Sequence, residues 1–298
     1  MKYSDTNKPL ICMMTQSTCY QGTRKMDIKG ICWHDTGCSN TWIKRYVQPS
    51  DNALDKDRML EILGVNVNHN DWNHKYRSGG VNAFIGKLAD GNISTVQTMP
   101  WDYRPWGVGK GKKGTLNDGW IQFEICEDAK KNKAYADSVY KEACELTAYL
   151  CKLYNIDPNG TVLFNGVKVP TVCCHGDASN LGFGDGHTDI YDWLPTYGYD
   201  MVTARKDITK LLTDNAKPDD NKKEDGKVYF NEFPTIKKGA KGIPVKVAQS
   251  ILGATIDGDF GNKTDTRVRA FQKEKNLYVD GIVGHKTWEA LMQYMSKM

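Results

Sequence analysis

Hydrophobic and polar residues in the first two-thirds of the chain follow two different periods. Short apolar, β-prone runs bounded by turn residues predict strands at residues 30–34, 83–88, 93–98, 120–126 and 171–175. The Asp90-Gly91 pair between the second and third runs is typical of a hairpin. Apolar residues at helical spacing predict a long amphipathic helix over 135–154 and a final helix over 201–212. Strands interleaved with helices predict an α/β domain, with a central mixed β-sheet covered by helices.

A different pattern appears near the C-terminus, where an eight-residue motif occurs twice. Residues 257–264 read DGDFGNKT, and residues 280–287 read DGIVGHKT. Each copy combines an Asp-Gly turn, an apolar anchor, a second glycine and a threonine suited to cap a helix. Helically spaced apolar residues follow each copy, and a further short helix is expected to end at Gly253. This pattern predicts a small all-α domain of three helices.

A charged and polar stretch separates the two patterns. The run from Lys217 to Lys227 is almost wholly charged or polar, which is typical of an exposed linker. We therefore predict a first domain over residues 1–215, a linker over 216–237 and a second domain over 238–298.

Composition limits the classes of function. The chain has 298 residues, of which 40% are apolar and 26% charged, as in ordinary globular proteins. No apolar run approaches the length of a membrane span, so no stable membrane association is expected. The start lacks the apolar segment of a signal peptide, and we expect the protein to stay in the cytosol that makes it until it is released. The net charge of +4 lies entirely in residues 238–298, and this basic density is too low to indicate nucleic-acid binding.

Candidate chemistry lies with two of the six histidines. The nine cysteines lack the C-x-x-C spacing of a structural zinc site and are expected to be small core residues. His34 ends the first predicted strand, and His175 ends the last one, before a glycine-rich run that reaches Asp189. A catalytic zinc needs three protein ligands and an open position, which two strand-end histidines and a residue returning on the loop would provide. A lone histidine at a strand end is more often a surface or hydrogen-bonded residue, so the pattern alone leaves both interpretations open.

The predicted strand at 120–126 contributes a carboxylate. Its apolar residues alternate with Gln122, Glu124 and Cys126, which share the other face. Burying Glu124 there is costly, so it either pairs with a cation or lies in a wet cleft. The alternative is the solvated outer face of an edge strand. Glu127 is a competing candidate, although it lies beyond the apolar run.

These segments together resemble a known family. The strand ending at His34, the segment NDGWIQFE at 117–124, the strand ending at His175 and the HTD segment at 187–189 resemble the N-acetylmuramoyl-L-alanine amidases of type 2, a group that includes peptidoglycan recognition proteins. That resemblance covers residues 32–212. Residues 238–294, with the doubled motif, resemble the peptidoglycan-binding domain found beside many wall hydrolases. Both resemblances imply bacterial peptidoglycan as the partner.

The amidase resemblance implies one Zn²⁺ per catalytic domain, with His34 and His175 as two ligands. The third ligand in the family is Asp or Cys. No cysteine follows Cys174, and we assign Asp189 in preference to Asp185 and Asp177.

The resemblance also implies catalytic roles. Glu124 matches the family's catalytic glutamate. The residue two before the third ligand is often lysine in the family, and here it is His187, which is then either the catalytic cation or itself a ligand. In the aromatic and glycine-rich segment 101–109, Trp101 and Trp106 are candidates for lining the substrate groove, the alternative being a packed loop.

The implied reaction is hydrolysis of the amide between the lactyl group of N-acetylmuramic acid and L-alanine, in an enzyme of the phage-endolysin type. Two other functions stay open. A zinc peptidase could cut the cross-linked stem peptide, and a non-catalytic receptor could bind the wall without cutting it.

Overall fold

The computed structural model describes residues 1–4, 6–214 and 234–295, in two units that divide between Pro218 and Asp219. Residues 216–233, most of the predicted linker, lie outside the described residues. Among the residues described, no helix is long and apolar enough to cross a membrane.

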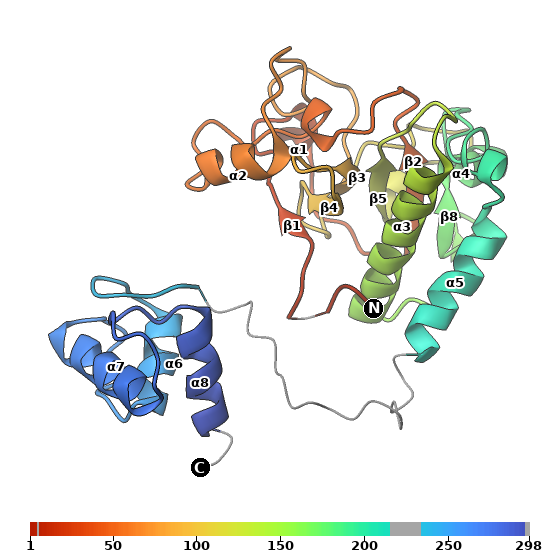
Figure 1. Ribbon diagram of the computed structural model, residues 1–298. Helices are drawn as coiled ribbons and strands as arrows, with labels where there is room; N and C mark the ends of the chain where they lie inside the picture. The colour runs from red at the N-terminus through yellow and green to blue at the C-terminus, as the bar shows by residue number, and fades with distance from the viewer. Residues whose placement is uncertain (5, 215–233, 296–298) are drawn as a thin grey trace. The chain divides into compact units, whose positions relative to one another are not determined.

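The first unit is built on one mixed sheet, which confirms the predicted architecture (Figure 1). The strand order is β1-β4-β3-β5-β2-β8, and β3 and β4 are the antiparallel pair among otherwise parallel neighbours. The strands are β1 (Leu10–Ile11), β2 (Gly30–Asp35), β3 (Ala83–Lys87), β4 (Ile93–Gln97), β5 (Trp120–Ile125) and β8 (Val172–Cys174). A separate hairpin joins β6 (Thr161–Phe164) and β7 (Val167–Pro170).

Helices cover both faces of this sheet. Figure 1 shows α3 (Lys133–Tyr154) and α5 (Met201–Asp214) side by side over one face, where the largest core cluster lies. The other face is covered by α2 (Lys56–Leu63), α4 (His175–Leu181) and the loops beside them. The remaining short elements are α1 (Thr18–Gly22), η1 (Ile43–Arg45), η2 (Leu116–Asp118) and η3 (Leu194–Tyr197).

The last predicted strand ends one residue earlier than expected. His175 does not close a strand but is the first residue of α4. Cys174 has extended backbone dihedral angles, and its N–H donates to the carboxylate of Asp177 at 3.2 Å, a capping contact that starts the helix. The glycine-rich run after His175 therefore begins as a helix and becomes a loop only after Leu181.

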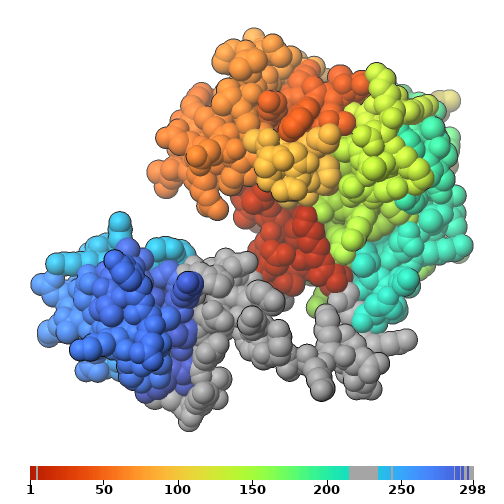
Figure 2. All heavy atoms as spheres, in the orientation of Figure 1, coloured from red at the N-terminus to blue at the C-terminus, as the bar shows by residue number. Residues whose placement is uncertain are grey.

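Two groups of polar contacts hold outer segments of this unit against its core. The N-terminal segment lies against α3 (Figure 2), and Lys2 Nζ donates to Glu142 at 2.7 Å. Asp128 lies between β5 and α3 and accepts four hydrogen bonds, from Trp193 Nε1, the Tyr197 hydroxyl and two backbone N–H groups. Burial alone raises the pKa of Asp128, but these hydrogen bonds outweigh it and hold that pKa below its usual value.

The second unit contains the three predicted helices, α6 (Ile243–Ile251), α7 (Asn262–Glu274) and α8 (His285–Met295). The repeat has a structural counterpart. The amide of Gln249 binds the Asp257-Gly258 turn and Thr264, and the amide of Gln272 binds the Asp280-Gly281 turn and Thr287 in the same way. Each glutamine thus holds one copy of the motif against its helix. The apolar core centres on Phe260 and Trp288.

Candidate metal centre and active site

The site lies where β2 ends, on the sheet face opposite α3. His34 and Glu124 are paired neighbours on β2 and β5, so their side chains lie on the same face. Strand β5 lies between β3 and β2 in the interior of the sheet. The alternative in which Glu124 faces solvent from an edge strand is therefore wrong, and its side chain is buried.

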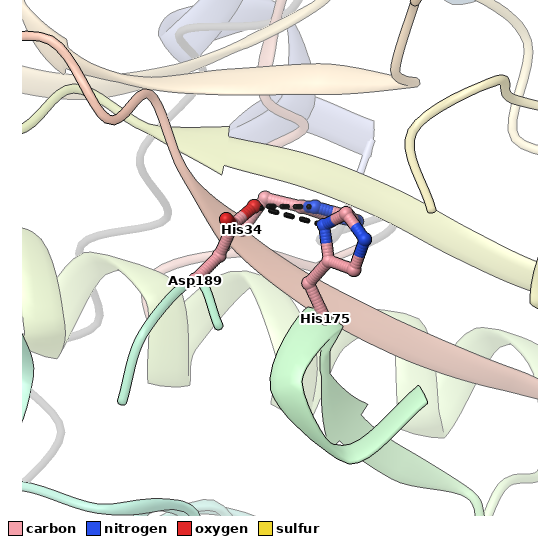
Figure 3. A group of neighbouring side chains, drawn as sticks. All are labelled: His34, His175 and Asp189. Carbon is pink, nitrogen blue, oxygen red and sulfur yellow. Dashed lines mark hydrogen bonds and ion pairs between the residues drawn. The ribbon is translucent and has the colours of Figure 1, made fainter. Parts of the chain in front are cut away.

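Two histidines and one carboxylate converge at this place (Figure 3). Asp189 Oδ2 lies 3.1 Å from His34 Nδ1 and 3.0 Å from His175 Nδ1. Both histidine side chains are buried, while that of Asp189 is 21% exposed. Asp35 holds the loop in place, because its carboxylate accepts the backbone N–H of Ile190 at 2.5 Å. The side chains predicted as the three ligands thus lie together.

The proton on His34 can be placed from its surroundings. The backbone N–H of Val108 donates to Asn117 Oδ1, so this atom is an acceptor and must receive the N–H of Gln122 Nε2. Gln122 therefore turns its Oε1 toward His34 Nε2, at 3.0 Å, and His34 Nε2 must be the donor. Burial lowers the pKa of His34, with His175 adding to the effect, so the ring is neutral and Nδ1 carries a lone pair.

His175 lies between two carboxylates. Its Nδ1 faces Asp189, and its Nε2 lies 3.0 Å from Asp185 Oδ1. Burial alone lowers the pKa of His175, but the two carboxylates reverse this and raise it. Burial likewise tends to raise the pKa of Asp189, yet the contacts with His175 and His34 lower it below its usual range. Asp189 therefore keeps its negative charge beside the imidazole rings of His34 and His175.

This donor set fits a divalent cation such as zinc. The lone pairs of His34 Nδ1 and Asp189 Oδ2 face each other at 3.1 Å, an arrangement that is favourable only with a cation or proton between them. Two imidazole nitrogens and one carboxylate oxygen are ligands that suit zinc and leave one coordination position open. Glu124 lies beside them, and its Oε2 is buried without a hydrogen-bond partner among the described residues. Burial, with Asp189 and Asp35 adding to it, raises the pKa of Glu124 well above its usual value.

His187 stands on the exposed side of this group. Its Nδ1 lies 3.0 Å from Asp185 Oδ1, and its side chain is 70% exposed. Asp185 therefore contacts both His175 and His187. The sequence pattern gave Asp185 only as an alternative third ligand and did not point to Gln122 as the partner of His34. The signal for Gln122 was present, because it shares a strand face with Glu124 two residues away.

The two tryptophans of the aromatic segment differ in burial. Trp101 is buried in the core cluster that packs on α3, so the prediction that it lines a substrate groove is wrong. Trp106 is half-buried, and the residue after it lies against the site. A Cβ at Gly107 would come 2.2 Å from Gln122 Oε1 and 3.2 Å from His34 Nε2, so a side chain there would displace the Gln122 amide.

Comparisons with known proteins identify a family for each unit. Residues 24–191 match the family model described as N-acetylmuramoyl-L-alanine amidase, and residues 248–291 match that of a peptidoglycan binding domain. A curated relative, N-acetylmuramoyl-L-alanine amidase CwlL of Bacillus licheniformis, is 28% identical over 189 residues, which are 60% of this chain and 46% of that protein. The chain thus spans about half the length of this relative.

Two solved structures are also similar. Hydrolase AmiA of Staphylococcus aureus, in complex with its ligand, has a TM-score of 0.46 and 18% identity, covering 70% of this chain and 86% of that one. A peptidoglycan-binding protein from Clostridioides difficile, in complex with glutamine hydroxamate, is 42% identical and covers 20% of this chain and 40% of that one, with a TM-score of 0.20.

Proposed function

The chain belongs to the N-acetylmuramoyl-L-alanine amidase family, and from this premise we propose that it hydrolyses the amide between the lactyl group of N-acetylmuramic acid and L-alanine in bacterial peptidoglycan. One zinc ion would be held by His34, His175 and Asp189. The observation that carries the proposal is the convergence of these three side chains beside a buried carboxyl group with an unpartnered oxygen.

The roles of the residues follow from their positions. When bound, zinc would polarise the scissile carbonyl and make a water molecule more acidic. Glu124 accepts the proton of that water with its unpartnered Oε2 and passes the proton to the leaving amine. His187, on the exposed side, donates a hydrogen bond to the oxygen that becomes negatively charged in the transition state. Trp106 is the remaining aromatic candidate for the substrate groove.

The second unit supports peptidoglycan as the polymer. Its match to a peptidoglycan binding domain suggests that it keeps the enzyme on the wall while the first unit cuts. Together the two units are suited to a lytic enzyme of the endolysin type.

The test is metal content combined with amine release. Purified full-length protein is analysed for zinc and incubated with purified peptidoglycan, before and after a chelator. About one zinc per chain, with new L-alanine N-termini that vanish on chelation and return with zinc, is the expected result. New termini at another residue of the stem peptide would replace the amidase by a peptidase. Zinc and wall binding without new termini would leave a receptor.

A further inference from the structure

One oxygen of Asp185 contacts two histidines with different positions in the site. Asp185 Oδ1 lies 3.0 Å from His175 Nε2 and 3.0 Å from His187 Nδ1. The other nitrogen of His175 is the one that faces Asp189 (Figure 3). The carboxylate therefore lies behind one proposed ligand and beside the proposed transition-state donor.

Asp185 is itself held firmly. Its backbone N–H donates to the carbonyl of Val108 at 3.0 Å, and the next N–H, of Gly186, donates to Ser179 Oγ at 3.1 Å. The carboxylate lies directly over the backbone of Gly109, where a Cβ would come 2.4 Å from Asp185 Oδ2. His187, by contrast, is largely exposed. The Asp185 contact is therefore positioned to restrain an exposed side chain whose ring also meets the His175 ring edge to face, with 5.2 Å between the centroids.

We propose that Asp185 is a positioning residue that fixes His175 as a ligand and holds His187 in its working orientation. This inference rests on the proposed zinc amidase function. The Asp185 carboxylate can only accept, so His175 Nε2 carries the proton and Nδ1 presents its lone pair toward Asp189. The same oxygen accepts His187 Nδ1–H, and in the imidazolium form of His187 the other ring nitrogen is then free to donate to substrate.

The two ligand histidines thus have different partners. His34 donates to the neutral amide of Gln122, whereas His175 donates to a carboxylate. A carboxylate behind a histidine raises its basicity as a metal ligand, and removing such a partner typically weakens metal binding about 10- to 100-fold. An asparagine at 185 keeps one acceptor oxygen of similar position but lacks the charge, so it should retain part of this effect, whereas an alanine should lose all of it.

A second cation is the competing explanation. His175, Asp185 and His187 offer ligand atoms that all lie within 4.8 Å of one another. A cation there would require His175 to lose the proton on Nε2 while Nδ1 already serves the first cation. The positioning role needs no such double deprotonation, and for that reason we favour it.

The experiment measures zinc affinity separately from activity. Full-length wild type, Asp185→Asn, Asp185→Ala, His187→Ala and the control Asp192→Asn are titrated with zinc against a competing chelator. The control removes one charge from the same region, where Asp192 accepts from Thr188 instead of a histidine. Nitrogen-15 NMR of the histidine rings reports which nitrogen of His175 carries the proton. Thermal unfolding of the zinc-free proteins checks that each variant folds.

We expect about 10- to 100-fold weaker zinc binding in Asp185→Ala, a smaller loss in Asp185→Asn and none in Asp192→Asn. His187→Ala should bind zinc as wild type does and lose activity. Unchanged affinity and an unchanged His175 NMR signal in both Asp185 variants would overturn the proposal. Two zinc ions in wild type but one in Asp185→Asn would overturn it in favour of a second cation site. A wild type that binds no zinc would instead remove the proposed function, and this inference with it.

Discussion

Replacing Glu124 by glutamine tests whether its carboxyl group has a catalytic or a structural role. The side chain is buried, keeps almost the same shape on substitution, and has an oxygen without a partner among the described residues. Loss of a general base lowers the rate about 10²- to 10⁴-fold. At about 1.4 kcal/mol per tenfold, this corresponds to roughly 3 to 5 kcal/mol in the activation barrier.

The effect on stability should be small. Burial raises the pKa of Glu124 well above its usual value, which favours the uncharged acid in the zinc-free protein, and glutamine is uncharged and of similar volume. Such a swap changes the free energy of unfolding by less than about 1.5 kcal/mol. A carboxylate paired with a buried cation would instead cost about 3 to 5 kcal/mol when neutralised.

The assay combines three measurements on Glu124→Gln: zinc content, urea unfolding with a chelator present, and release of L-alanine N-termini from peptidoglycan. Glu127→Gln, three residues further along, is the matched control and should keep wild-type activity. Wild-type rates in Glu124→Gln would refute its role as the base. Loss of zinc from this variant would show that Glu124 belongs to the ligand set.

Three further predictions concern other parts of the molecule. Gly107→Ala places a methyl group 2.2 Å from Gln122 Oε1, so we expect weaker zinc binding and lower activity. Gly79→Ala is the control, because a Cβ there would lie 3.6 Å from its nearest atom, and it should match wild type in the same assays. Asp128→Asn should lower the free energy of unfolding by about 2 to 3 kcal/mol at pH 7. Because the folded-state pKa of Asp128 is lowered, its stabilisation is complete above about pH 4 and fades as the pH falls through that pKa. The difference from wild type in urea unfolding should therefore shrink in acid, and a constant difference would contradict this. Trp288→Ala removes a fully buried ring and should lower the free energy of unfolding by about 3 to 5 kcal/mol, enough to unfold so small a unit. The variant should then fail to co-sediment with cell walls but continue to hydrolyse a soluble muropeptide. Retained wall binding would argue against this unit as the wall-binding part.

The sheet could be predicted from the sequence because its main strands are long enough to show an apolar pattern. Strands β2, β3, β4, β5 and β8 all lie within one or two residues of the predicted runs. The two-residue β1 is too short to show such a pattern. The hairpin of β6 and β7 did show one, because β-prone apolar residues flank the Asn165-Gly166 turn, but it was overlooked. Helix α4 was missed because its sequence, HGDASNL, is polar and follows a strand directly.

The amidase family and the peptidoglycan-binding unit could also be predicted from sequence motifs, and the matches to both family models confirm them. Residues at strand ends, such as His34, keep a fixed relation to the sheet, so a sequence motif can identify them. The wrong assignment of Trp101 has the opposite cause. An aromatic segment outside a regular strand has no period, and nothing in the sequence tells which of its rings faces the core.

Apart from Gln122, the residues that surround the site side chains could not be predicted, because they come from distant parts of the chain. The network that places the proton on His34 begins at the backbone of Val108 and passes through Asn117 and Gln122. Neither the loop's path nor its close approach at Gly107 is encoded in a local pattern. Only the folded chain brings these groups within hydrogen-bonding distance.

The site has a buried half and an exposed half, and substitutions in the two halves should have different effects. His34, Gln122 and Glu124 lie on interior strands and are buried. Substitutions of these residues are expected to alter metal binding or the chemical step. His187 is exposed and depends on Asp185 for its orientation. Since Asp185 also contacts His175, a substitution of Asp185 can disturb both halves together. A loss of zinc affinity and of activity from the same Asp185 variant, but of activity alone from His187→Ala, is the pattern that this division requires.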